Sequence, residues 1–175
     1  MAKSFMVAAL VAATALCFSV VLTTAHGDKL FVEGHVYCDP CGVEFQTSIS
    51  TPITGCKVHL TCRNRENDTV TYKVGGVTDV KGMYSLPVEG EHEDDICEVR
   101  LGGGHAGNCR VPFKTAVDSA RVLLTNNVGV VTPVRSANAL GYKTPGADKR
   151  CHKVLLDMGF PPIDASELLE FSFHN

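Results

Sequence analysis

The sequence has no tryptophan and only four tyrosines among its 175 residues. A protein that stacks sugars on an exposed aromatic platform would therefore have little material for one. Common catalytic motifs are also missing, including Gly-x-Ser-x-Gly, His-Glu-x-x-His and the Gly-Lys-Ser/Thr of a phosphate loop. Catalytic groups can converge from distant positions. The absences nevertheless favour a protein that is not an enzyme and that needs no metal or cofactor.

Positive charge is in short supply. The chain has 16 Lys and Arg residues against 19 Asp and Glu residues, which gives a formal net charge of -3. Nucleic acids and anionic membranes both favour proteins with basic patches. The overall charge therefore predicts neither of them as a partner.

Long apolar runs are absent after residue 22. The uncharged stretch from Phe5 to Leu22 follows Lys3 and precedes small residues around Ala25. This pattern is typical of a secretory signal peptide, and we predict one over residues 1–25. The alternative is a membrane anchor, because the run nears the ~18-residue minimum for a spanning helix. The mature chain, 26–175, is predicted to be secreted as a single β domain with a less ordered tail after about residue 163.

Cysteine is abundant. Of eight cysteines, Cys17 lies in the predicted signal peptide, so seven remain in the mature chain. In an oxidising compartment this odd number predicts three disulfides and one leftover thiol. The spacing alone leaves the pairing open.

Apolar and polar residues alternate in several short segments, as they do in half-buried strands. Turn residues at Asp79 to Gly82 separate two of these segments and predict a hairpin. The spacing of the segments predicts an all-β fold, an antiparallel barrel or sandwich of about seven strands. The main segments lie at residues 56–62, 70–74, 84–88, 97–101 and 120–126.

Near the end of the chain, apolar residues recur with the spacing of a helix instead of that of a strand. Cys151, Val154, Leu155 and Met158 follow the i, i+3, i+4, i+7 spacing of one helix face, and Gly159 follows as a stop signal. We therefore predict a short C-terminal helix, which a bridge from Cys151 would pin to the sheet.

The Cys38-Asp-Pro-Cys41 segment admits three interpretations. A redox centre needs a helix after the first cysteine to lower its pKa, but turn formers follow here, and the neighbouring aspartate disfavours a thiolate. A zinc site needs a second close pair of ligands, and Cys56 and Cys62 are poorly spaced for one. Two half-cystines bound to different partners is the interpretation that we favour.

Other candidate sites have simpler explanations. The acidic segment 89–95 lacks the layout of a calcium loop and is predicted to be a solvated hairpin loop. The glycines of segment 101–105 are expected to form a flexible turn. His35 and His59 have no motif partner at a recognisable spacing.

Several segments resemble one known family. The motif EGHVYCDPC, together with GCKVHLTCRNRENDTVTY, GVTDVKGMYSL, HEDDICEV and LLDMGFPP, is similar to successive blocks of the pollen Ole e I allergen and extensin-like family of plant secreted glycoproteins. The likeness extends over most of the mature chain. One position departs from it, because the family signature usually continues with arginine after the second cysteine and this chain has Gly42.

The resemblance implies a disulfide pattern in which the first cysteine pairs with the fifth, the second with the sixth and the third with the fourth. Cys56 stands outside that set and is expected to be the free thiol. Cys62 and Cys97 both lie on the apolar faces of their predicted strands. A bridge across a core requires such positions, so the alternation agrees with the Cys62–Cys97 pair. The implied bridges are Cys38–Cys109, Cys41–Cys151 and Cys62–Cys97.

Asn67 begins the only Asn-x-Ser/Thr triplet in the chain whose middle residue is not proline. It lies in a polar run between two predicted strands, where a glycan would meet no core. We therefore predict N-glycosylation at Asn67, with an unoccupied site as the alternative.

Three classes of function remain open. The resemblance implies a non-enzymatic protein of the plant cell wall or pollen surface that binds a receptor ectodomain or a wall component, with roles in pollen hydration, germination or tube growth. A structural or carbohydrate-binding wall protein is the second class. An extracellular enzyme or redox protein is the third, and the missing motifs argue against it.

Overall fold

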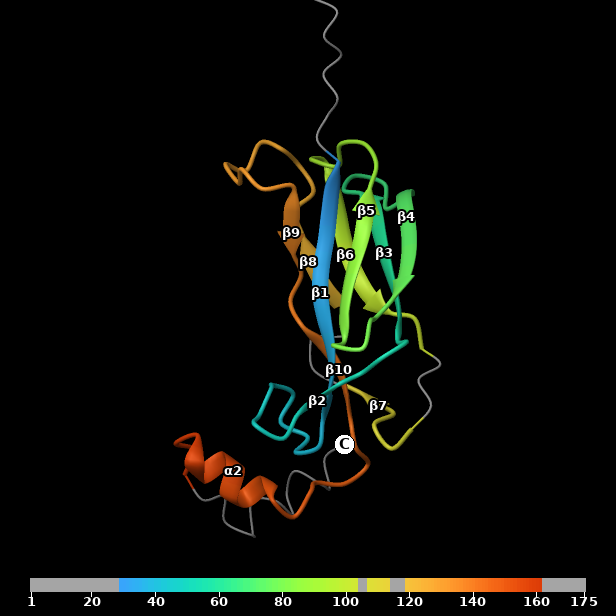
Figure 1. Ribbon diagram of the computed structural model, residues 1–175. Helices are drawn as coiled ribbons and strands as arrows, with labels where there is room; N and C mark the ends of the chain where they lie inside the picture. Colours follow the sequence, from blue (N-terminus) through green and yellow to red (C-terminus); the bar gives the residue numbers. More distant parts are fainter. Residues whose placement is uncertain (1–28, 104–106, 114–118, 162–175) are drawn as a thin grey trace, which may run out of the picture.

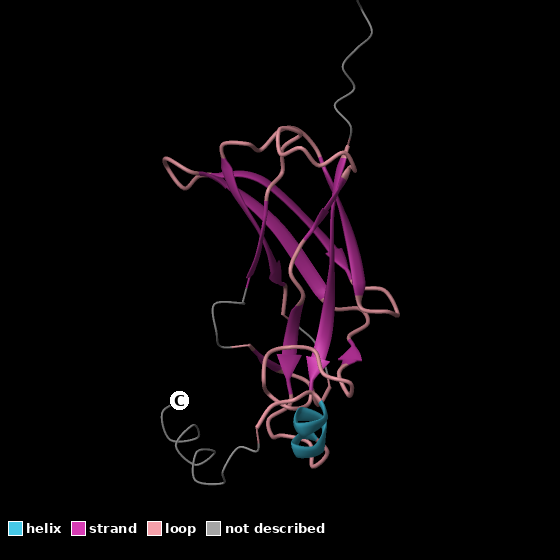
Figure 2. Cartoon of the chain, turned by 90° about the vertical axis from the view of Figure 1, so that its left-hand side faces the viewer, coloured by secondary structure: helices cyan, strands magenta, loops and turns pink. Residues whose placement is uncertain are grey.

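Two β-sheets face one another across an apolar core, and a short helix lies at one end of them (Figures 1 and 2). The computed structural model describes residues 29–103, 107–113 and 119–161. The predicted signal peptide at 1–25 and the predicted tail after about residue 163 lie outside the described residues.

The first sheet is organised on one long strand, β1 (Leu30–Asp39), which runs most of the length of the sandwich in Figure 1. Its first half pairs with β5 on one side and β9 on the other, and its second half pairs with β2 and β10. Strand β7 extends the sheet beyond β10. These neighbours are β2 (Thr51–Pro52), β5 (Met83–Val88), β7 (Val111–Pro112), β9 (Val134–Ser136) and β10 (Leu140–Lys143).

The second sheet has four strands in the order β4-β3-β6-β8, and each neighbouring pair is antiparallel. Its strands are β3 (Lys57–Asn64), β4 (Val70–Val77), β6 (Asp95–Leu101) and β8 (Ser119–Val122). The alternation read from the sequence places the inward side chains of β3 and β6 correctly. Val58, Leu60 and Val99, for example, are fully buried. Val70 of β4, by contrast, was expected to face inward with Tyr72 and Val74, but it is 52% exposed beside a register shift between Cys62 and Arg63.

The core forms where the inward faces of the two sheets meet. Val32, Leu86 and Val88 come from the first sheet, and Leu60 and Val99 come from the second. Burial of such side chains is the main stabilising term for a sandwich of this size. The predicted sandwich is confirmed, and seven of its strands have four or more residues.

Not every pairing is antiparallel. β9 and β10 both run parallel to β1, with Phe31 beside Val134 and Val36 beside Leu140. The register changes by one residue between them, so β9 and β10 follow the same edge of β1 as one interrupted strand. The chain reaches this edge from β8, which lies in the other sheet, and the direction of β9 is therefore not set by a hairpin.

The predicted hairpin around Asp79 to Gly82 is wrong. The turn forms, because the Asp79 carboxylate accepts hydrogen bonds from the backbone of Lys81 and Met83 and Gly82 has a φ of 74°. However, β4 belongs to the second sheet and β5 pairs with β1 in the first. Turn residues predict that the chain reverses, but not which sheet edge receives the next strand.

Helix α2 (Cys151–Asp157) confirms the predicted C-terminal helix. Cys151 and Val154 are its buried residues, and Gly159, with a φ of 88°, follows its end. Figure 2 shows the helix at one end of the sandwich, and Figure 1 shows that this is the end where β1 finishes. In the part of the chain that the structure describes, no helix is long and apolar enough to cross a membrane.

Candidate functional site: the disulfide-linked end

Asp39, at the end of β1, organises the loop that carries the second cysteine of the Cys-x-x-Cys segment. Its side chain is fully buried and accepts three backbone hydrogen bonds. Oδ1 accepts from Cys41 at 2.8 Å and from Gly42 at 3.0 Å, and Oδ2 accepts from Glu44 at 2.7 Å. From the sequence, this aspartate was expected only to disfavour a thiolate at the neighbouring cysteine. The signal that was missed is the tendency of Asp to bond backbone amides of a following turn.

The loop after Asp39 has an unusual backbone. Gly42 has a φ of 71° and Glu44 a φ of 61°, and both values lie in the left-handed region. Gly42 is thus suited to the conformation at the position where the family signature usually has arginine. Glu44 is held there by the hydrogen bond that its backbone amide donates to Asp39 and by Lys143, whose Nζ lies 3.2 Å from Glu44 Oε1.

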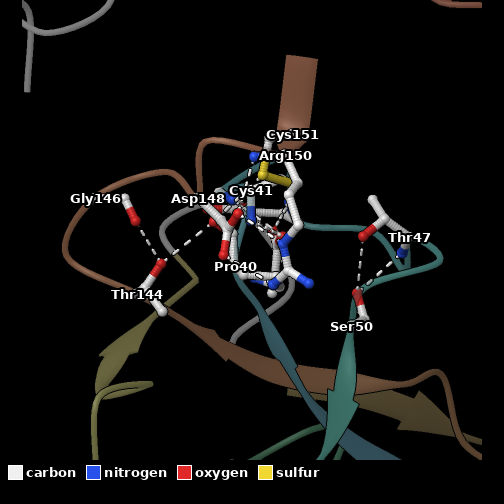
Figure 3. Close-up of a disulfide and its surroundings, with 12 residues drawn as sticks. Pro40, Cys41, Thr47, Ser50, Thr144, Gly146, Asp148, Arg150 and Cys151 are labelled. Atoms are coloured by element: carbon white, nitrogen blue, oxygen red, sulfur yellow. Dashed lines mark hydrogen bonds and ion pairs between the residues drawn. A yellow bond between two sulfur atoms is a disulfide. The ribbon is translucent and has the colours of Figure 1, made fainter. Parts of the chain in front are cut away.

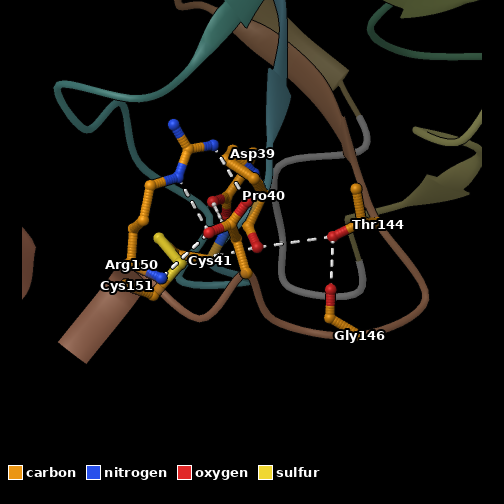
Figure 4. A network of polar contacts seen from close by, with 8 residues as sticks. Asp39, Pro40, Cys41, Thr144, Gly146, Arg150 and Cys151 are labelled. Atoms are coloured by element: carbon orange, nitrogen blue, oxygen red, sulfur yellow. Dashed lines mark hydrogen bonds and ion pairs between the residues drawn. A yellow bond between two sulfur atoms is a disulfide. The ribbon is translucent and has the colours of Figure 1, made fainter.

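The Cys41–Cys151 bridge attaches this loop to the start of α2 (Figure 3), with 5.4 Å between the two Cα atoms. The backbone supports the same junction, because the Asp148 amide donates to the Pro40 carbonyl at 2.9 Å. The Thr144 hydroxyl lies 2.6 Å from the Gly146 carbonyl oxygen and 3.4 Å from that of Pro40 (Figure 4). The helix therefore has a defined position relative to β1.

Arg150 forms a bidentate ion pair with Asp148 just before the helix. Its Nε and Nη2 atoms each lie 2.9 Å from a carboxylate oxygen of Asp148. These hydrogen bonds lower the pKa of Asp148 to about 2. The pair lies in a turn stabilised by a bidentate contact, which is the strong form of an Arg–carboxylate interaction.

The Cys38–Cys109 bridge holds the other cysteine of the segment, with 5.7 Å between the Cα atoms. The rings of Tyr37 and Phe113 pack edge to face beside it at 5.6 Å. Cys38 and Cys41 therefore bind different partners, and neither is a free thiol. This segment is a structural junction and has no dithiol for redox chemistry.

The third bridge, Cys62–Cys97, joins directly paired residues of β3 and β6. It lies within one sheet, so the expectation that it would cross the core is wrong. All three bridges have the pairing that the family resemblance implies. The expected free thiol, Cys56, is 1% exposed, and burial raises its pKa.

His92 lies beside the Cys62–Cys97 bridge, and one ligand atom from each of the three residues falls within 4.8 Å of the others. The two sulfurs are bonded to each other, so they are not the thiolates that a metal would need. Both ring nitrogens of His92 also face oxygen acceptors, Nδ1 at 2.9 Å from Asp95 Oδ2 and Nε2 at 3.0 Å from the Glu89 carbonyl. The cluster is therefore structural.

Segment 89–95 is less simple than the predicted solvated hairpin loop. Its glutamates are exposed, but His92 is buried and its amide donates to the Leu124 carbonyl at 3.1 Å. The segment joins β5 of the first sheet to β6 of the second, so it is not a hairpin. A hydrogen bond from Thr71, and to a smaller extent one from His92, lowers the pKa of Asp95. A His-x-x-Asp spacing was the signal available in the sequence.

The remaining candidates are scattered. Asn67 is exposed in the turn between β3 and β4, and the Thr69 hydroxyl donates to Asn67 Oδ1 at 2.7 Å. His35 Nδ1 lies 2.9 Å from Gln46 Nε2 on the first sheet, whereas His59 lies on the second. The structure brings none of these three together. Part of segment 101–105 lies outside the described residues.

Comparison with known proteins agrees with this framework. The model of the family described as "Pollen protein Ole e 1 like" matches residues 28–159. The chain belongs to this family. It is 42% identical over 167 residues to an Olee1-like protein of Betula pendula, covering 94% of this chain and 98% of the relative. It is 37% identical over 161 residues to the anther-specific protein LAT52 of Solanum lycopersicum, covering 91% and 99%.

The fold is shared as well. The crystal structure of the major plantain pollen allergen Pla l 1 superposes with a TM-score of 0.63 at 31% identity, covering 70% of this chain and 99% of that one. Other relatives of this Ole e 1-like chain are named as pollen allergens or as pollen- or anther-specific proteins.

Proposed function

We propose that the chain is a secreted pollen protein that acts outside the cell by binding a receptor ectodomain or a cell-wall component, with a role in pollen hydration, germination or tube growth. Family membership over residues 28–159 carries this proposal. A relative that matches 91% of the chain is named as anther-specific, and one that matches 75% of it is named as pollen-specific. The predicted signal peptide at 1–25 and the three disulfides suit an oxidising extracellular setting.

Binding, rather than catalysis, agrees with how the chain uses its reactive groups. Six cysteines are bridged, and Cys56 is buried. His92 and Asp95 bond each other, and the buried Asp39 bonds the backbone of its own loop. Groups engaged in this way stabilise loops.

The disulfide-linked end supports the same proposal, because it holds apolar side chains at the surface. Leu156, Met158 and Phe160 at the end of α2 are between 41% and 45% exposed, and Phe160 stacks on Phe45 at 5.3 Å. Exposed apolar groups on a rigid support are common at sites of protein recognition.

Affinity capture tests this proposal. The mature chain, secreted from plant cells, is immobilised and exposed to an extracellular pollen extract, beside a control chain whose disulfides have been reduced and alkylated. We expect the folded chain, and not the control, to retain a receptor ectodomain or a wall component. Turnover of a wall substrate that one point mutation abolishes would instead establish an enzyme. Retention of the full-length chain inside the cell would contradict secretion.

A further inference from the structure

We propose that the outer face of the β4-β3-β6-β8 sheet binds an acidic polysaccharide, a polymer whose sugar units carry carboxylates. This inference rests on the extracellular setting proposed above and assigns a binding surface and a ligand class within it. We call the surface the cationic face. It is made of Lys57, His59, Arg63, Lys73, Arg100 and Arg121.

The register of the sheet brings these residues to one side. Val58, Leu60 and Cys62 of β3 are buried in the core, so the alternating residues of β3 point outward. Residues paired across neighbouring strands point to the same side of a sheet. Two outward rows result, Gly75-His59-Arg100-Ser119 and Lys73-Thr61-Glu98-Arg121, with Lys57 and Arg63 beyond them on β3.

Positive charge dominates this face although the whole chain has a net charge of -3. Glu98 is the only acidic residue at the outward positions of the four strands. Arg100 lies 3.0 Å and Arg121 lies 3.4 Å from its carboxylate oxygens. Arg63 approaches Asp68 of the adjacent turn at 3.8 Å. Excess positive charge therefore remains for an anionic partner.

The two lysines carry most of this excess. Both Lys57 and Lys73 are exposed, and within the described ranges neither forms an ion pair. Arg100 and Arg121 also remain open to solvent, with side chains 54% and 68% exposed. The two lysines and Arg121 are thus at the surface, where a polyanion can contact them.

The middle of the cationic face has few projecting side chains. A Cβ atom at Gly75 would meet His59 Nδ1 at 2.9 Å, and one at Gly102 would meet His59 Nε2 at 2.7 Å. The imidazole therefore lies along the sheet between two residues that have no side chains. A flat surface of this kind suits an extended chain better than a small molecule, which prefers a concave pocket.

The spacing and type of the side chains on the cationic face favour one class of polyanion. Outward residues of one strand repeat about every 6.6 Å, and neighbouring strands lie about 4.8 Å apart, so the cations form a regular array. A polymer with regularly spaced carboxylates can contact several of them at once and gain from multivalency. Single-stranded nucleic acids need stacking aromatics. His59 supplies the only ring among the six residues of this face.

Two double variants with the same charge change test the assignment. Lys57→Gln/Lys73→Gln alters the cationic face, and Lys149→Gln/Lys153→Gln alters exposed lysines near α2, at another end of the molecule. Binding of the full secreted chain to immobilised polygalacturonate is measured at low and at physiological salt, with the fully methyl-esterified polymer as the uncharged reference. We expect the first variant to weaken binding about tenfold and the second less than twofold.

Salt should weaken binding of the unmodified chain, and the methyl-esterified polymer should not bind. Equal losses in both variants would overturn the assignment by showing that only net charge matters. Binding unchanged in Lys57→Gln/Lys73→Gln, or a preference for anionic lipid vesicles over polygalacturonate, would overturn it too. Capture of a receptor without any polygalacturonate binding would leave the proposed function intact and defeat only this inference.

Discussion

Tyr84 is a buried residue whose hydroxyl finds no hydrogen-bond partner among the described residues. Burial raises its pKa to about 12, and the side chain packs directly against Gly34 of β1. The absence of a Cβ at Gly34 makes room for the phenol ring. This pair explains why a glycine lies in the middle of a long central strand, where it would otherwise weaken the sheet.

We predict that Tyr84→Phe leaves the free energy of unfolding unchanged or raises it by up to about 1 kcal/mol, because the substitution removes an unsatisfied buried hydroxyl. Chemical denaturation with the disulfides intact measures the change. Tyr72→Phe is the matched control. Its hydroxyl donates to the Pro87 carbonyl at 3.1 Å, so this variant should lose about 1 kcal/mol. A loss of that size in Tyr84→Phe would show that its hydroxyl has a partner.

Cys56 is predicted to be the one free thiol, and burial should protect it. Its side chain is 1% exposed and its pKa is raised, so little thiolate forms and reagents have poor access. Mass spectrometry after treatment with an alkylating agent should show no modification of the folded, non-reduced chain and one modified cysteine after denaturation. Rapid alkylation of the folded chain would contradict this, as would a peptide in which Cys38 is bonded to Cys41.

At the scale of elements, the turn between β3 and β4 presents the predicted glycosylation site. Asn64 Oδ1 accepts from the Glu66 and Asn67 amides, and Asn67 Oδ1 accepts from the Thr69 amide and hydroxyl. These bonds shape an exposed turn in which the acceptor asparagine lies outside the core.

We predict that Asn67 of the plant-secreted protein carries an N-glycan. A peptide N-glycosidase that cleaves plant glycans should lower its mass, and Asn67→Gln should abolish the shift. Asn64→Gln alters the same turn but not the acceptor triplet, so it should keep the glycan. Recovery of the unmodified Asn67 peptide at full abundance would contradict the prediction.

The Cys41–Cys151 bridge is expected to determine the order of α2, because the helix has only two buried residues. The bridge closes a sequence separation of 110 residues. In the chain-entropy model, the variant Cys41→Ala/Cys151→Ala should lose about 4–5 kcal/mol of unfolding free energy. Hydrogen exchange should show loss of protection in residues 151–157 before the sheets open.

A second double variant, Cys62→Ala/Cys97→Ala, provides the comparison. It removes a bridge of separation 35 within the second sheet and should lose about 4 kcal/mol. The relative protection of α2 should then be unchanged. If both variants lowered the protection of α2 to the same degree, the Cys41–Cys151 bridge would not be its specific anchor.

For the whole molecule, segment 89–95 joins the two sheets through His92 and Asp95. The segment also reaches the chain after β8, because Asn126 and Asn127 donate to Glu91 and Glu93 at 2.7 Å. Thr71 donates to Asp95 Oδ2 at 2.6 Å. Ionised Asp95 is therefore bonded from β4 and from within its own segment.

Acid should weaken this connection. The pKa of Asp95 is lower in the fold than its ordinary value of 3.8, so its contribution to stability is complete above that value and is lost as pH falls through the lower folded pKa. We predict that the free energy of unfolding decreases from pH 5 to pH 2. Asp95→Asn should be less stable at pH 5 and should have a shallower decrease. An unchanged slope in Asp95→Asn would contradict the assignment.

The sequence by itself determined the local features. Alternation placed the inward faces of β3, β5 and β6, the helical period placed α2, and the odd number of cysteines implied a free thiol. These features depend on neighbours a few residues apart, which a pattern records directly. The cysteine pairing did not follow from spacing and came from the resemblance to a family.

Only the tertiary structure decided which strands meet. The sequence could not assign β5 to β1, align β9 and β10 parallel to it, or bury His92 against Asp95. It also missed the cationic face, because a negative net charge conceals cations that four strands gather through their register. Each of these outcomes joins residues far apart in the chain. The physical reason is that such pairings depend on which edges and apolar faces remain uncovered when the sheets pack, and no local pattern contains that information.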